Sequence, residues 1–192
     1  MNKAELRAEM TRIMKDIGAA DLAERSARVA RRLGETEAWR RADVVLCFLS
    51  MPHELETAEM IRAARAEGKT VAVPWIEGNN IRFLLLPEET GSLARDRWGI
   101  SVPDPSWAAL DPARAARPLV AAPGLAFDRS GHRLGRGKGY YDRFLAHARP
   151  AARGLSVIGV CLSEQLLDAV PHSAGDQRVD GIVTDAETML LA

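Results

Sequence analysis

Residues 124–143 read GLAFDRSGHRLGRGKGYYDR, a stretch too rich in glycine for a helix and too charged for a buried strand. It follows an apolar run at residues 118–123 (PLVAAP) and leads into residues 140–148, which have the pattern of a helix start. A strand, a glycine loop and a helix in this order present backbone N–H groups to a phosphate at the helix N-terminus. Arg133, Arg136 and Lys138 add positive charge at the same place. The stretch therefore predicts a nucleotide-phosphate site.

The loop differs from the two best-known phosphate loops. Lys138 follows Gly137 as a P-loop requires, but histidine and glycine stand where the other glycine and the Ser/Thr should be. The glycines run G-R-G-K-G rather than G-x-G-x-x-G, so the dinucleotide pattern fails as well. A flexible basic loop without a ligand is the alternative interpretation. Tyr140, Tyr141 and Asp142 favour a site, because aromatic rings suit a base or substrate ring and a carboxylate suits Mg²⁺.

The same stretch resembles the signature of a known enzyme family. Phe127-Asp128, Gly131 and the run from Arg133 to Asp142 (RLGRGKGYYD) look like the motif of 5-formyltetrahydrofolate cyclo-ligase, also called 5,10-methenyltetrahydrofolate synthetase. The resemblance extends over almost the whole chain, although its specific part is the glycine loop. It implies Mg²⁺- and ATP-dependent cyclisation of 5-formyltetrahydrofolate to 5,10-methenyltetrahydrofolate. The γ-phosphoryl group would pass to the formyl oxygen, N10 would then close the ring, and ADP and phosphate would be released.

The resemblance assigns roles to residues by their position in this chain. The residues expected at ATP are Lys3, Arg7, Arg133, Leu134, Gly135, Arg136, Gly137, Lys138, Gly139, Tyr140 and Tyr141. Arg136, Lys138 and Tyr140 are expected to act in catalysis, where cations neutralise charge during phosphoryl transfer. The residues expected at the folate are Met51, Glu56, Trp98, Arg136 and Tyr140, and those expected at Mg²⁺ are Asp142 and Asp180.

The first expected ATP ligands lie on an amphipathic helix near the start of the chain. Asn2 and Glu5 have the spacing of a capping box, and apolar residues follow at helical spacing as far as residue 17. Lys3 and Arg7 are four residues apart and therefore share a face of this helix. Spacing alone would make them solvated surface charges; the family resemblance places them at ATP instead.

Three other assignments have structural alternatives. Glu56 could simply precede the next helix and favour its dipole. Trp98 could be a core tryptophan beneath a loop rather than a wall of the folate pocket, and Val102 stands before Pro103 where many family members carry an acidic or amide residue. Asp180 taken alone could be a solvated aspartate at the end of a strand.

Apolar runs and helical patterns alternate along the chain. Strands are expected at residues 43–50, 70–74, 81–86, 118–123, 155–162 and 179–184, and helices at residues 3–17, 22–33, 60–68, 140–148 and 163–170, with a short helical piece around Trp39. Asp128 is expected to hold an Asx turn in the loop. The order predicts one domain over residues 1–192, a three-layer α/β/α sandwich with a mainly parallel sheet. The resembled family has a fold similar to those of sugar-phosphate isomerases and coenzyme A transferases.

Composition limits the classes of function. The chain has 26 Lys+Arg and 26 Asp+Glu, which disfavours a nucleic-acid-binding module and any general attraction to membranes. Cys47 and Cys161 lie in apolar runs, which favours buried thiols over a disulfide. Without an apolar signal segment or 18 consecutive apolar residues, the chain is expected to be cytoplasmic, and the family suggests a monomer acting on small molecules.

Two rival functions share the predicted fold. A repurposed paralogue would keep the nucleotide loop and bind a ligand other than folate. A sugar-phosphate isomerase or acyl transferase would work without ATP, which the glycine loop argues against.

Overall fold

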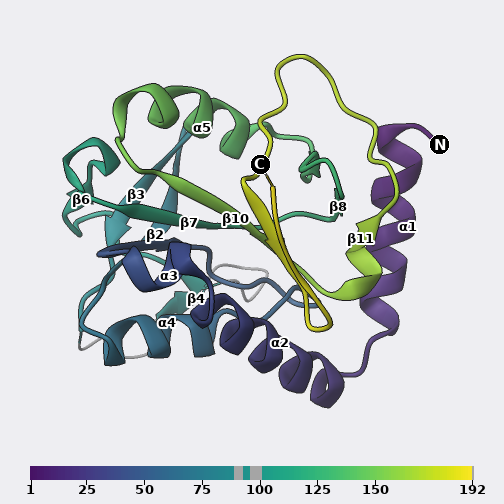
Figure 1. The fold of residues 1–192 in the computed structure, drawn as a ribbon, viewed down its shortest axis with the longest axis horizontal. Coiled ribbons are helices and arrows are strands. Elements are labelled where there is room, and N and C mark those ends of the chain that lie inside the picture. Colours follow the sequence, from purple (N-terminus) through teal and green to yellow (C-terminus); the bar gives the residue numbers. More distant parts are fainter. Residues whose placement is uncertain (89–92, 96–100, 192) are drawn as a thin grey trace.

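An eight-stranded sheet forms the centre of the computed structural model, which describes residues 1–88, 93–95 and 101–191 (Figure 1). In spatial order its strands are β13 (Thr188–Leu190), β12 (Gly181–Val183), β10 (Ser156–Val160), β7 (Pro118–Ala122), β1 (Val44–Cys47), β2 (Thr70–Glu77), β3 (Asn80–Leu85) and β6 (Ala109–Leu110). The run from β12 to β2 is parallel, whereas β13, β3 and β6 are antiparallel strands toward the two edges. The predicted mainly parallel sheet is confirmed.

Helices cover both faces of this sheet. α2 (Ala19–Gly34), α3 (Glu37–Arg41) and α4 (Ala58–Ala66) lie on one face, and α5 (Tyr140–Ala151) lies on the other (Figure 1). Successive side chains of a strand point to opposite faces, so Val45 and Cys47 join the core under α2 and α4 while Val44 and Leu46 join the core under α5. This division gives the predicted three layers.

The N-terminal helix α1 (Lys3–Asp16) packs beside the sandwich on a small second sheet. That sheet contains β11 (Leu166–Leu167), β8 (Ala126–Asp128) and β9 (Arg133–Leu134), and its apolar side chains form a separate cluster with those of α1. The predicted capping box is present, since Asn2 accepts from the N–H of Glu5 and the Glu5 carboxylate accepts from the N–H of Asn2. Two further short strands, β4 (Ala94–Arg95) and β5 (Ser101–Val102), pair antiparallel.

Part of the 124–143 stretch is a buried hairpin rather than a loop. β8 and β9 pair antiparallel, and the charged side chains that argued against a strand are buried because they have partners. Asp128 accepts from the N–H groups of Ser130 and His132, so the predicted Asx turn is present. The ring of Phe127 packs so closely that a Cβ on Gly159 of β10 would lie 2.5 Å from it.

One predicted helix and the start of another were wrong. Residues 163–170 form only the 3₁₀ turn η2 (Ser163–Gln165), because Leu166 and Leu167 pair with β8 as strand β11. The second helix begins at Ala19, three residues earlier than expected, with Gly18 as its N-cap. A second 3₁₀ turn, η1 (Pro112–Arg114), precedes β7.

Both cysteines are free and buried, as predicted, and burial raises the pKa of each thiol, that of Cys47 to about 12. No helix in the described part of the chain has the length and apolarity that a membrane span needs.

Candidate functional site

The segment between β9 and α5 forms a tight turn at the N-terminus of a helix. Gly137 (φ 95°) and Gly139 (φ 66°) both adopt left-handed backbone conformations, which glycine adopts without steric cost. Gly139 is the N-cap of α5, and no side chain caps this helix end. The first-turn N–H groups are therefore the donors that a phosphate would need.

The three cations predicted for the phosphate site, Arg133, Arg136 and Lys138, occupy different environments. Arg136 and Lys138 are exposed on the turn. Arg133 lies inside the protein with its side chain 3% exposed, and it donates to Asp142 Oδ1 at 2.8 Å. Arg133 therefore supports the start of α5 from inside the protein. Arg136 and Lys138 are exposed, so a ligand can reach them.

The two tyrosines of the motif also differ. Tyr140 is half-buried at the helix start. The Tyr141 hydroxyl is fully buried with no hydrogen-bond partner in the described structure, its ring lies 5.5 Å from the Arg133 guanidinium, and burial raises its pKa. The Tyr141 hydroxyl thus points into the protein beside Arg133, whereas both tyrosines remain partly exposed.

The N-terminal helix reaches the same turn. Arg7 Nε donates to the carbonyl of Gly135 at 2.9 Å, and its guanidinium lies beside Gly137, where an added Cβ would be 3.4 Å from Arg7 Cζ. Lys3 Nζ pairs with Asp176 Oδ2 at 2.5 Å. The structure therefore brings Arg7 to the glycine turn and ties Lys3 to Asp176, and neither side chain is a fully solvated surface charge.

A small cavity of about 110 Å³ opens between α1, the segment after β1 and the glycine stretch. It is lined by Thr11, Met14, Lys15, Pro52, His53, Glu54, Gly124, Leu125, Arg136 and Gln165. Arg136 is the residue that belongs both to this cavity and to the exposed cations of the turn. The cavity and the candidate phosphate site are therefore adjacent.

The buried carboxylate of this cavity belongs to Glu54. Its side chain is 15% exposed, it accepts from the N–H of Met51 at 3.0 Å, and Oε1 lies 3.6 Å from Arg136 Nη2. Burial raises the pKa of Glu54, and the Met51 N–H and the Arg136 charge offset that rise only in part. A carboxyl with a pKa shifted in this way inside a cavity is a candidate for function.

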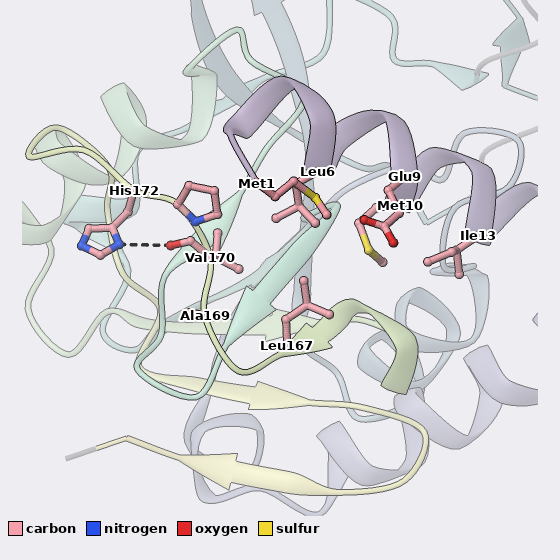
Figure 2. A pocket seen from close by; sticks show the side chains of 10 residues that line it. Met1, Leu6, Glu9, Met10, Ile13, Leu167, Ala169, Val170 and His172 are labelled. Atoms are coloured by element: carbon pink, nitrogen blue, oxygen red, sulfur yellow. Dashed lines mark hydrogen bonds between the residues drawn. The ribbon is translucent and has the colours of Figure 1, made fainter.

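A larger, mostly apolar cavity of about 630 Å³ lies between α1 and the segment that follows β11 (Figure 2). It is lined by Met1, Leu6, Glu9, Met10, Ile13, Leu167, Ala169, Val170, Pro171 and His172. None of these residues was expected at ATP or folate, and neither Arg136 nor Lys138 reaches this cavity. We place the functional site at the smaller cavity because the charged groups converge there.

Comparison with known proteins identifies the family. The sequence model of the 5-formyltetrahydrofolate cyclo-ligase family matches residues 1–185. The chain belongs to this family.

Members of the cyclo-ligase family align along nearly the full chain. A probable 5-formyltetrahydrofolate cyclo-ligase of Schizosaccharomyces pombe is 29% identical over 96% of this chain and 95% of its own length. A 5-formyltetrahydrofolate cyclo-ligase of Mycolicibacterium smegmatis is 31% identical over 83% of this chain and 87% of its own length. Among solved structures, the 5,10-methenyltetrahydrofolate synthetase of Aquifex aeolicus superposes with a TM-score of 0.81 at 27% identity, covering 100% of this chain and 93% of that one.

On the folate side, the structure brings to the cavity a glutamate that the sequence analysis did not select, Glu54. The Glu56 side chain is exposed and is not among the residues that line the small cavity, and its backbone N–H donates to Ser26 Oγ of α2. Met51 is half-buried and contributes its N–H to Glu54. Glutamates two residues apart in one irregular segment have no periodicity that could separate them, so only the structure shows that Glu54 faces Arg136. Trp98, the other expected folate contact, lies outside the described residues.

The two aspartates expected at Mg²⁺ have different partners, since Asp142 accepts from Arg133 and Asp180 pairs with Arg149. Asp180 pairs with Arg149 at 2.9 Å and accepts from the N–H of Val157 at the start of β10. Arg149 lies seven residues beyond Asp142, about 10 Å along α5 at 1.5 Å per residue. In the described residues no group of three or more His, Cys, Asp or Glu could hold a metal ion.

Asp142 lies beside the glycine turn, where a cation that accompanies a phosphate ligand could reach it. It lies in the first turn of α5 with its side chain 24% exposed, and its Oδ1 accepts from Arg133 and from the N–H of Gln177. No hydrogen bond among the described residues engages its Oδ2. Mg²⁺ commonly takes one or two protein carboxylates and fills its other positions with phosphate oxygens and water, so one carboxylate beside a phosphate turn fits.

Proposed function

We propose that this chain catalyses the ATP-dependent ring closure of 5-formyltetrahydrofolate to 5,10-methenyltetrahydrofolate, with release of ADP and phosphate. The observation that carries the proposal is the shared position of Arg136. This cation belongs both to the glycine turn with its uncapped helix N-terminus and to the cavity walled by Glu54. A phosphate donor and a ring substrate could therefore meet at one side chain.

The chemistry asks for charge neutralisation more than for a protein nucleophile. The formyl oxygen attacks the γ-phosphorus and ADP leaves, which turns a poor leaving group into phosphate. N10 then adds to the formyl carbon, phosphate departs and the N10 proton is lost. Phosphoryl transfer depends mainly on in-line positioning and stabilisation of the equatorial oxygens. The exposed side chains of Arg136 and Lys138 and the first N–H groups of α5 can supply both.

When bound with ATP, Mg²⁺ would neutralise the β- and γ-phosphate oxygens. Asp142 is the residue that would hold it. A metal role for Asp180 would require its ion pair with Arg149 to open. Lys3 and Arg7 would contact ATP as well. Lys3 is held by its ion pair with Asp176, and Arg7 is held by its hydrogen bond to the Gly135 carbonyl.

The folate would enter with its pterin end. The cavity of about 110 Å³ is well below the roughly 300–1,000 Å³ of pockets that enclose a drug-sized ligand, so it would hold one end of the molecule. The Glu54 carboxylate can accept from the amino and ring N–H donors of a pterin. Arg136 and Tyr140 lie at the turn that would hold the phosphate, so their side chains could contact the formyl group as it is phosphorylated.

The direct test mixes purified protein with 5-formyltetrahydrofolate and Mg-ATP and follows the near-ultraviolet absorbance of methenyltetrahydrofolate, with ADP measured in parallel. We expect product and ADP in equal amounts, and no product when ATP is omitted or replaced by a non-hydrolysable analogue. ATP binding without product would instead indicate a repurposed paralogue.

A further inference from the structure

Arg143 occupies an unusual place for a cation. It lies in the first turn of α5, where the helix dipole disfavours positive charge. In the described structure its guanidinium pairs with no carboxylate. Nε donates to the carbonyl of Asn79 at 2.9 Å, Nη2 also contacts that oxygen, and Nη2 donates to the carbonyl of Lys138 at 3.0 Å. One side chain thus joins two backbone segments more than fifty residues apart.

The guanidinium also covers the turn that receives the phosphate in the proposed function. It lies 5.5 Å from the ring of Tyr140, within the range of a cation–π contact. A Cβ added to Gly139 would lie 2.8 Å from Arg143 Nη1, so the guanidinium packs directly on this glycine. Lys138, Gly139 and Tyr140 are therefore all in contact with the same group.

The second backbone segment that Arg143 contacts is the turn of the β2–β3 hairpin. β2 and β3 pair antiparallel from Ala72 and Leu85 out to Glu77 and Asn80, and a two-residue turn with Gly78 at φ 59° closes them. The Asn79 carbonyl sits in that turn. A hairpin tip held by a continuous ladder is a fixed point to which the glycine turn is tied.

We propose that Arg143 is a positioning residue for ATP. It ties the Lys138–Gly139 turn to the tip of the β2–β3 hairpin and so holds the Lys138 side chain and the uncapped N–H groups of α5 in the conformation that accepts phosphate. The inference rests on the proposed function, because ATP is the ligand of that turn. A planar guanidinium can donate to two carbonyls at once, whereas a lysine ammonium would retain the charge without the fork.

The test compares Arg143→Ala and Arg143→Lys with wild type. Mg-ATP binding is measured by calorimetry, the KM values for ATP and for 5-formyltetrahydrofolate by steady-state kinetics, and the fold by thermal melting. We expect both variants to bind ATP about tenfold more weakly, with the folate KM changed by less than about twofold and the melting temperature unchanged. Arg62→Ala is the matched control, since Arg62 is exposed on α4 and pairs only with Glu59 of the same helix.

Three results would overturn the inference. Normal ATP affinity in both variants would remove any role at the turn. Full recovery in Arg143→Lys would show that charge alone matters. A lower melting temperature with equal losses for ATP and folate would show general support of the fold. If wild type binds ATP but forms no product, the proposed function fails while the calorimetric comparison still decides the role of Arg143; Arg143→Gln replaces the alanine variant if that one does not fold.

Discussion

Replacing Glu54 with glutamine should stabilise the fold and damage the activity at the same time. The Glu54 side chain is 15% exposed. The Arg136 side chain is 46% exposed, and its Nη2 lies 3.6 Å from Glu54 Oε1. That distance is longer than the roughly 2.8 Å of a strong charge-assisted hydrogen bond. The carboxylate therefore loses its hydration and regains little from its partner.

The magnitude follows from two opposing terms. An unscreened pair at 3.6 Å would gain on the order of 4–5 kcal/mol at an effective dielectric of 20, but solvent around the half-exposed guanidinium reduces this to about 1 kcal/mol or less. Desolvation of a largely buried carboxylate costs a few kcal/mol. The raised pKa of Glu54 shows that burial prevails. Glutamine can keep the bond from the Met51 N–H, so Glu54→Gln should gain about 1 kcal/mol of unfolding free energy at pH 8.

The direction of the Glu54 pKa shift determines how the stability gain in Glu54→Gln depends on pH. A carboxyl whose pKa is higher in the folded protein destabilises it above the folded pKa, and this cost disappears once the pH is below the ordinary value of 4.5. The gain in Glu54→Gln should thus be present in urea titrations at pH 8 and absent near pH 4. The matched control is Glu56→Gln, because Glu56 is exposed two residues away and should shift stability by less than about 0.5 kcal/mol.

Turnover distinguishes the two glutamates as well. We expect kcat/KM for 5-formyltetrahydrofolate to fall at least about tenfold in Glu54→Gln and to stay near wild type in Glu56→Gln. A loss of stability in Glu54→Gln at pH 8 would refute the energetic reasoning. Loss of turnover in Glu56→Gln alone would restore the assignment made from the sequence.

Three further predictions concern the hairpin and the turn. Gly159→Ala would bring a Cβ within 2.5 Å of the buried Phe127 ring, so the unfolding free energy should fall by about 1–3 kcal/mol, and an unchanged thermal melt would contradict the packing described. Asp128→Asn should lose about 2 kcal/mol at pH 7, because burial would raise the pKa of Asp128 but bonds from Val170 and His132 outweigh it and lower the pKa. That stabilisation is lost as the pH falls below the ordinary value of 3.8 and through the lower folded pKa, so the gap between variant and wild type should narrow in chemical denaturation at acid pH; a constant gap would count against the prediction. Lys138→Ala should raise the KM for ATP at least about tenfold without changing the melting temperature, since this side chain is exposed; normal kinetics would remove Lys138 from the site.

The layers of the fold were predictable because their signals are local. Buried parallel strands are continuous apolar runs, as at Val44–Cys47 and Pro118–Ala122, and α1 carries its capping box in four residues. The β8–β9 hairpin was not predictable from such patterns. Its charged side chains are buried only because distant partners satisfy them, as when Asp128 accepts from the N–H of Val170.

The site was predictable to the level of the motif and not to the level of its side chains. The sequence places Arg133, Arg136 and Lys138 within six residues, but strand geometry turns Arg133 inward to Asp142 and leaves the other two outside. Asp142 and Asp180 were expected at one metal ion, and only the structure shows that Arg133 holds Asp142 while Arg149 holds Asp180. Only the structure shows that Glu54 faces Arg136, because no local pattern contains the position of that side chain.

The contact between Lys3 and Asp176 joins residues 173 positions apart. During synthesis the helix that carries Lys3 leaves the ribosome first, and the segment that carries Asp176 leaves almost last. The apolar partners of α1 in the small sheet, Leu125 to Leu134 and Val170, also emerge late. A nascent chain that contains only the first hundred residues lacks the glycine turn and Asp176, so it cannot form the proposed ATP site. Binding of nucleotide at the proposed ATP site would therefore report on completion of the chain, and it would serve as a probe for the final step of folding on the ribosome.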